Sequence, residues 1–102
     1  MTKRAFLRHV KQAIQQIDPQ AEVWLFGSRA RGDARPDSDW DFLMLTDKPV
    51  DRAFKYYVWG CLNDVEIATT QVISTRIFNK YEWSQLTVTD LYKNIKTDGI
   101  RL

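Results

Sequence analysis

The sequence predicts an α/β (α+β) domain in which helices pack on a small mixed β-sheet. Three observations lead to this expectation. Apolar residues recur at helical intervals in some segments, form short runs bounded by turn residues in others, and the two patterns alternate along 102 residues. Hydrophobic residues make up 44% and charged residues 27%, as in ordinary globular proteins. We therefore expect residues 1–102 to form a single domain.

The N-terminal third predicts a helix, a strand and a single helical turn. Apolar residues at three- and four-residue spacing predict a helix over residues 4 to 17, which ends before Pro19. The short apolar run at residues 22 to 26 stops at Gly27 and is typical of a buried strand. Residues 28 to 31 then have the pattern of one helical turn.

A second strand is expected over residues 39 to 46, after a loop rich in turn residues. Side chains along a strand alternate between the two faces of its sheet. The two sets are Trp40, Phe42 and Met44 on one face, and Asp39, Asp41, Leu43 and Leu45 on the other. Both acids should therefore point the same way from one end of the strand.

Four further elements complete the expected order of helices and strands. They are a helix over about 50 to 62, a strand from Val65 to Ile73, a short helix over about 75 to 84 capped by Ser74, and a last helix over about 90 to 97.

Composition narrows the classes of function. The net charge of +2 is too small to indicate a nucleic-acid partner by itself, and no apolar stretch approaches the ~20 residues of a membrane span. The single Cys61 excludes an internal disulfide and a cysteine-rich zinc site. The N-terminus lacks the apolar core of a signal peptide, so we expect a cytoplasmic protein without a membrane partner.

The turn after the first strand is suited to binding phosphate. Gly27 lets the backbone approach an anion, Ser28 offers a hydroxyl, and the start of a helical turn exposes unpaired N–H groups. Arg29 and Arg31 add positive charge, and a guanidinium can contact two phosphate oxygens at once. A Gly-Ser turn taken alone more often has a purely structural role.

Asp39 and Asp41 are candidate ligands of a divalent metal. The two acids are two residues apart on the expected strand, so their Cα atoms are separated by ~6.6 Å and both carboxylates can converge on one ion. Magnesium prefers such carboxylates together with water and the substrate's phosphate oxygens. The alternative is a pair of solvated acids at a strand end. Two like charges on one face of a buried strand are costly without a cation, which favours the metal.

Gly27-Ser28, a gap of ten residues, and then Asp39-Trp40-Asp41-Phe42 resemble the signature of the DNA polymerase beta-like nucleotidyltransferase superfamily. The fuller string around this motif is similar to the minimal nucleotidyltransferases (MNT) of bacteria and archaea. The resemblance implies that fold, Mg²⁺, and transfer of a nucleoside monophosphate from a nucleoside triphosphate such as ATP to an acceptor hydroxyl. It assigns phosphate binding to the Gly-Ser turn and metal binding to the two acids.

Active members of this superfamily usually bring a third acid from the following strand, where it binds metal and activates the acceptor. Glu66 is the candidate here, because apolar residues flank it in the predicted strand, and Asp64 is a weaker one. For both, an exposed acid without a catalytic role is the alternative.

Three functions remain open at this point. The first is a nucleotidyltransferase whose acceptor site comes from a homo-oligomer or a partner, for which the resemblance suggests a HEPN-type protein in a toxin–antitoxin pair. The second is a catalytically inactive nucleotide-binding or antitoxin module of the same fold. The third is a basic nucleic-acid adaptor, for which the modest charge gives little support.

Overall fold

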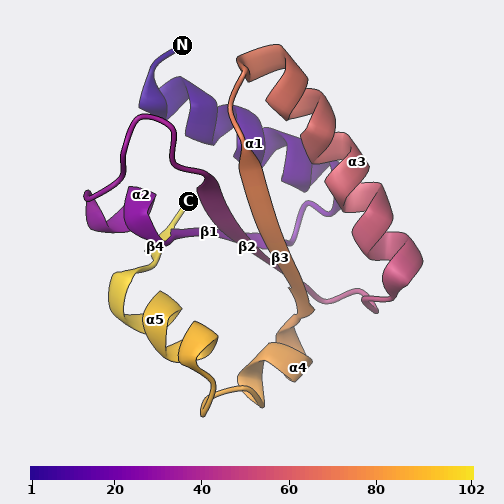
Figure 1. The fold of residues 1–102 in the computed structure, drawn as a ribbon. Coiled ribbons are helices and arrows are strands. Elements are labelled where there is room, and N and C mark those ends of the chain that lie inside the picture. The colour runs from indigo at the N-terminus through magenta and orange to yellow at the C-terminus, as the bar shows by residue number, and fades with distance from the viewer.

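The computed structural model describes residues 1–102 as one mixed sheet with helices on both faces (Figure 1). In chain order the elements are α1 (Lys3–Ile17), β1 (Glu22–Phe26), α2 (Ser28–Arg31), β2 (Trp40–Thr46), α3 (Arg52–Thr69), β3 (Ile73–Asn79), α4 (Lys80–Ser84), α5 (Asp90–Asp98) and β4 (Ile100–Arg101). None of the helices has the length and hydropathy needed to cross a membrane.

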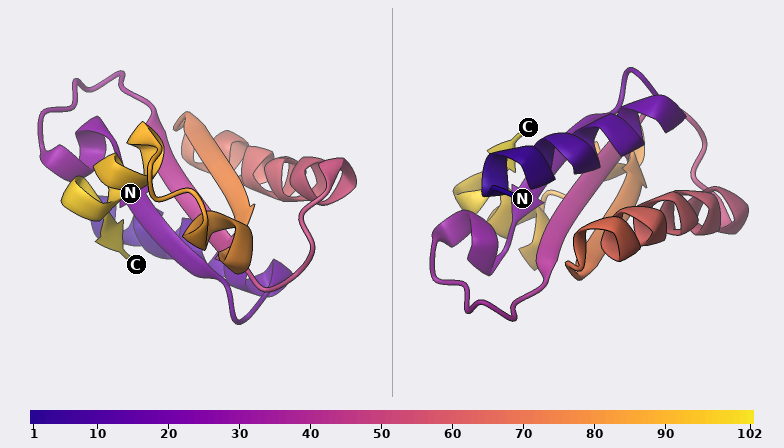
Figure 2. Two further views of the ribbon diagram at one scale, coloured as in Figure 1. Left: turned by 90° about the horizontal axis from the view of Figure 1, so that it is seen from below. Right: turned by 90° about the horizontal axis from the view of Figure 1, so that it is seen from above.

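The strands lie in the order β3-β2-β1-β4. Strand β1 is antiparallel to both of its neighbours, whereas β2 and β3 are parallel and are joined by the crossover helix α3. The mixed sheet predicted from the sequence is therefore confirmed. Figure 2 shows helices α1 and α3 together on one side of the sheet, with α4 and α5 on the other.

The two faces of the sheet carry two hydrophobic clusters of different size. The larger cluster joins α1, α3 and one face of the sheet: Phe6, Val10, Ile14, Ala21, Val23, Leu25, Trp40, Phe42, Met44, Val58, Leu62, Val65 and Ile77. The smaller cluster joins α4, α5 and the other face: Leu43, Leu45, Trp83 and Ile95. The predicted alternation along β2 is thus confirmed. Each fully buried large side chain contributes about 1.5–3 kcal/mol to folding. Burial on both faces therefore fixes β2 between the two helical layers.

The expected strand from Val65 to Ile73 is wrong, because residues 65 to 69 are helical and β3 begins only at Ile73, and the expected helix over about 50 to 62 is too short. Helix α3 continues to Thr69, because Val65 extends the buried stripe of Val58 and Leu62 at helical spacing. Thr70, with φ of 57°, ends the helix in the left-handed region.

The expected helix over about 75 to 84 is also wrong over its first half. Strand β3 runs from Ile73 to Asn79, and its alternate residues Thr75 and Ile77 are buried. Only Lys80–Ser84 is helical, with the Asn79 side chain accepting hydrogen bonds from the backbone N–H groups of its first turn. The period of two from Ile73 onwards was the available signal for a strand.

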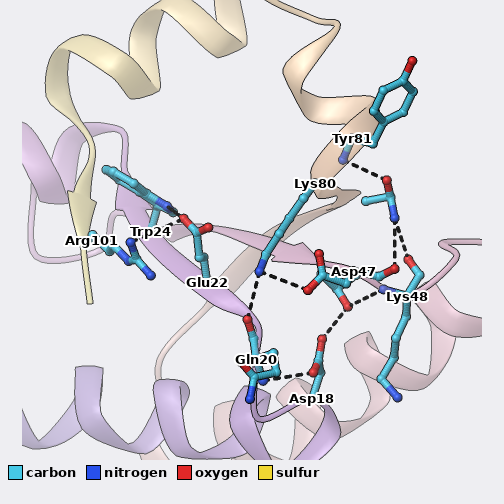
Figure 3. A network of polar contacts seen from close by, with 11 residues as sticks. Asp18, Gln20, Glu22, Trp24, Asp47, Lys48, Lys80, Tyr81 and Arg101 are labelled. Carbon is cyan, nitrogen blue, oxygen red and sulfur yellow. Dashed lines mark hydrogen bonds and ion pairs between the residues drawn. The ribbon is translucent and has the colours of Figure 1, made fainter.

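A polar network fixes the end of the sheet that is remote from the two acids (Figure 3). The buried Asp18 carboxylate accepts hydrogen bonds from the Thr46 hydroxyl at 2.5 Å and the Gln20 N–H at 3.0 Å. Lys80 donates to the Gln20 carbonyl and to Asp47. Burial alone would raise the pKa of Asp18, but these hydrogen bonds, with the charges of Lys48 and Lys80, keep it below its ordinary value.

Candidate functional site

Antiparallel pairing of β1 and β2 places the Gly-Ser turn beside the acidic pair. Phe26, the last residue of β1, lies opposite Asp41 in the register. The approach is so close that a Cβ added to Gly27 would collide with the Asp41 carboxylate. The structure therefore brings together the turn and the acids that were expected to share one end of the sheet.

The conformation of the turn explains why glycine occupies position 27. Gly27 has φ of 74° and ψ of −160°, a backbone conformation that is almost confined to glycine. Its carbonyl accepts the N–H groups of Ala30 and Arg31, each at 3.1 Å, and so starts the single turn of α2. The first N–H groups of a helix have no intrahelical acceptor. In this short helix the backbone N–H groups of Ser28 and Arg29 are thus the ones available to an anion beside the Asp41 carboxylate.

The two carboxylates differ in exposure and influence each other. Asp41 is half-buried, whereas Asp39 is exposed at the start of the strand. Burial raises the pKa of Asp41, the negative charge of Asp39 raises it further, and Arg31 opposes the rise. A cation would stabilise this pair of neighbouring carboxylates, and their oxygen donors suit Mg²⁺.

Arg29, expected to bind phosphate, is occupied elsewhere in the structure. Its guanidinium donates to the carbonyls of Pro36 and Ser38, at 3.1 Å and 2.8 Å. It also stacks on the Trp40 ring, with Cζ 4.4 Å from the ring centroid. Arg29 therefore fastens the loop between α2 and β2, and in doing so positions the start of the strand that carries both acids.

Arg31 remains close to the acidic pair. Its Nε lies 3.3 Å from Asp33 Oδ2, but both side chains are largely exposed, so this ion pair is weak. Its effect on the pKa of Asp41 shows that its positive charge reaches the candidate site. Of the two arginines, Arg31 is the one that remains available for a phosphate.

Glu66, the expected third carboxylate, lies on helix α3 and not on a strand. Its carboxylate accepts a hydrogen bond at 2.8 Å from the backbone N–H of Ile73, and so it helps to start β3. No group of three acidic, histidine or cysteine side chains is assembled anywhere in the chain. The prediction that Glu66 completes a site with Asp39 and Asp41 thus rested on a wrong element assignment. Asp64 is exposed on the same helix.

The strand that follows the acids in the sheet supplies no carboxylate. In the parallel register Ser74 lies beside Asp41, and Arg76 lies beside Leu43. Residues paired in this way point to the same face of a sheet, so both side chains share the face of Asp41. The acidic part of the candidate site consists of Asp39 and Asp41, with Ser74 as their neighbour.

A sequence model of a protein family, described as nucleotidyltransferase domain, matches residues 7–101. The chain belongs to this family. The match spans the turn, both acids and every strand of the nucleotidyltransferase domain. The resemblance seen in the Gly-Ser and Asp-x-Asp motifs is thereby confirmed.

Among curated proteins, the domain is similar to a Haemophilus influenzae protein named "Probable protein adenylyltransferase MntA". The two are 43% identical over 42 residues, which are 41% of this chain and 37% of that protein. The aligned part is thus well under half of the relative, so its activity as a whole protein is not transferred by this match.

Solved structures share the fold at low sequence identity. A toxin–antitoxin complex with AMP-PNP aligns with a TM-score of 0.67 at 18% identity, covering 92% of this chain and 69% of that one. A Shewanella oneidensis complex of a tri-AMPylated HEPN toxin with its MNT antitoxin aligns with a TM-score of 0.65 at 14% identity, covering 98% and 71%. These likenesses establish the nucleotidyltransferase fold, as predicted.

Proposed function

We propose that this domain is a Mg²⁺-dependent nucleotidyltransferase that transfers AMP from ATP to an acceptor hydroxyl. The observation that carries the proposal is the contact geometry at Gly27, whose backbone lies against the Asp41 carboxylate. An anion-binding turn and a cation-binding pair at one point suit a polyphosphate bound to a divalent metal. In the reaction, the acceptor oxygen bonds to the α-phosphorus, the bond to pyrophosphate breaks, and the hydroxyl proton is released to solvent.

The proposal gives each residue a definite role. Asp39 and Asp41 would hold Mg²⁺, which when bound neutralises the polyphosphate and favours in-line displacement. The amides that begin at Ser28, with the Ser28 hydroxyl, would bind the phosphates that leave. Arg31 would add a positive charge beside them. Gly27 keeps this side of the site free of a side chain, so that phosphate and carboxylate can lie close together.

We infer that the acceptor is a protein hydroxyl on a HEPN-type toxin. Two similar proteins support this: one is named "Probable protein adenylyltransferase MntA", and another is an MNT antitoxin in complex with a tri-AMPylated HEPN toxin. The two acids lie at the rim of the sheet with Asp39 exposed, so a macromolecular acceptor can reach them. Such an ATP-dependent reaction on a toxin would take place in the cytoplasm.

The experiment is a label-transfer assay with the co-expressed HEPN-type partner, Mg²⁺, and ATP labelled at either the α- or the γ-phosphate. Label should reach the partner from α-labelled ATP and not from γ-labelled ATP. Asp41→Asn should abolish transfer, whereas Asp33→Asn, which removes an exposed acid nearby, should retain it. Label arriving from the γ-phosphate, or equal activity in Asp41→Asn, would contradict the proposal.

A second candidate function is a nucleotide-binding module that performs no transfer. It is favoured by Ser74, which lies beside Asp41 where the superfamily usually has a third acid. Under this function the wild-type chain would bind Mg²⁺ and ATP but transfer no label. The variant Ser74→Asp would then add the missing carboxylate on the correct face and should generate measurable transfer. Transfer by the wild type would exclude this candidate.

A further inference from the structure

A cavity of about 430 Å³ opens between the sheet and helices α4 and α5. Its floor is formed by Leu43 and Leu45, and its walls by the rings of Trp24, Trp83 and Tyr92. This volume falls within the range of small-molecule sites, which are mostly apolar with a few polar groups at their edge. The cavity is therefore of a size and character to take part of a small ligand.

The cavity adjoins the acidic pair on the same face of the sheet. Along β2, Asp41, Leu43 and Leu45 are successive residues of one face, spaced by about 6.6 Å between Cα atoms. In β1, Phe26 lies opposite Asp41, and Trp24 lies opposite Leu43. The cavity thus begins one strand repeat beyond the acids.

Three of the other hollows of the molecule lie away from this face. One lies between α1 and α3, one is bordered by the start of α1 and the end of α3, and one lies along the first turns of α3. The fourth lies at the outer edge of β3, beside Lys55 and Trp59. Arg76 and Phe78 line that fourth hollow from the face of Asp41, but it lies at the sheet edge, whereas the cavity over Leu43 spans β2 and β1, the strands that lead to Asp41 and Gly27.

The lining favours a flat ring over a polar or charged group. The centroids of Trp83 and Tyr92, which both line the cavity, lie 5.1 Å apart, so the two rings form one aromatic wall. The Trp24 indole N–H donates to Glu22, whose carboxylate also faces Arg101 (Figure 3). These polar groups satisfy one another, which leaves stacking as the main interaction on offer.

Two lysines, Lys80 and Lys96, also line the cavity. Lys96 lies over the Tyr92 ring, with Nζ 5.7 Å from its centroid, and Lys80 borders the opposite side. Lys80 is held by the Gln20 carbonyl and by Asp47, whereas Lys96 is on the exposed face of α5. Because Lys80 belongs to the polar network remote from the acids, the feature that favours a nucleobase is the apolar aromatic interior, on which a base can stack.

We propose that this cavity holds the nucleobase of the triphosphate, with space for a purine; the proposal rests on the function proposed above. The phosphates would lie at Gly27 and the acids, and the base would stack against Trp83 and Tyr92. The aromatic cavity would then supply affinity for a nucleotide beyond what the phosphate-binding turn gives to any polyphosphate.

The test compares Mg²⁺-ATP with Mg²⁺ and inorganic triphosphate by isothermal titration calorimetry. Lys96→Trp should fill the mouth of the cavity from an exposed position, and Lys93→Trp is a matched control on the same helix that does not border it. Lys96→Trp should weaken ATP binding about tenfold, the size of one lost base stack, and leave inorganic triphosphate unchanged. Lys93→Trp should match the wild type for both ligands. Ser84→Trp, from the opposite helix, should repeat the effect of Lys96→Trp.

Each other outcome overturns the assignment. If Lys96→Trp binds ATP as tightly as Lys93→Trp, the base lies elsewhere; if it also loses label transfer, the cavity belongs to the acceptor. If the wild type binds inorganic triphosphate as tightly as ATP, the phosphate site is supported and the nucleobase site is contradicted. If the wild type binds neither ligand, the proposed function fails together with this inference.

Discussion

Replacing Gly27 by alanine tests the contact on which the site depends. The new Cβ would collide with the Asp41 carboxylate, and the backbone would remain in a conformation that alanine avoids. Gly32 provides a matched control, because it also has a positive φ, of 85°, but a Cβ there would meet nothing within 4 Å. Both variants therefore suffer backbone strain, but only Gly27→Ala displaces the Asp41 carboxylate.

The loss of stability in each variant follows from its backbone strain and, for Gly27→Ala, from the collision with Asp41. Gly32→Ala should lower the free energy of unfolding by about 1–2 kcal/mol, the usual cost of a left-handed residue with a Cβ. Gly27→Ala should lose about 1–3 kcal/mol through backbone strain, and a further ~1 kcal/mol because Asp41 must leave its preferred rotamer. A domain of ordinary stability, about 5–15 kcal/mol, remains folded under either change.

The assay combines urea unfolding with titration of Mg²⁺-ATP. Gly27→Ala should bind the nucleotide roughly tenfold to a hundredfold more weakly, the loss expected for one charged hydrogen bond, while Gly32→Ala should bind as the wild type does. In the double variant Gly27→Ala with Asp41→Ala, part of the lost stability should return, since the collision partner is gone. Equal nucleotide affinity in the two glycine variants, or strictly additive changes in stability, would show that the Gly27–Asp41 contact does not shape the site.

Three further predictions concern the frame around the site. The pKa of Asp18 is lowered from 3.8 in the fold, so its contribution to stability is present above that pH and is lost as the pH falls through the folded pKa. Asp18→Asn should therefore cost roughly 1.5–3 kcal/mol at pH 7 in urea unfolding, and the deficit should shrink in acid; a deficit independent of pH would contradict this. Arg29→Lys should lose the bonds to the loop carbonyls and so raise amide exchange over residues 33 to 38, without abolishing nucleotide binding. Trp59→Phe should cost about 1 kcal/mol, because its indole N–H donates to the Thr75 carbonyl at 2.9 Å on the edge strand; an unchanged denaturation midpoint would count against that bond.

Local patterns were sufficient to predict the half of the fold that carries the site. The alternation from Trp40 to Leu45 has a period of two with large apolar residues on both faces, so its strand could be placed and its acids assigned to one face. The approach of the turn to the acids was also predictable, because a short loop returns the chain to a neighbouring strand. The collision at Gly27 was not, since it depends on the register of Phe26 against Asp41.

The prediction for the second half of the chain was wrong where the same residues fit both a helical and a strand periodicity. Val65 and Ile67 alternate with polar residues as in a strand, yet Val65 also continues a helical stripe, and the packing of α3 on α1 favours the helix. Ile67 is consequently 72% exposed, which no strand in the sheet core would allow. Because the boundary was misplaced, Glu66 was assigned to a strand although it lies on α3. For the same reason the position of Ser74 beside Asp41 was not predicted.

The most direct measurement is a crystal structure of this domain with Mg²⁺ and a non-hydrolysable ATP analogue. We expect one cation held by oxygens of both Asp39 and Asp41, with phosphate oxygens bound by the backbone N–H groups of the Ser28 turn. A triphosphate bound away from the Gly27 turn, or a cation that contacts neither acid, would contradict this expectation.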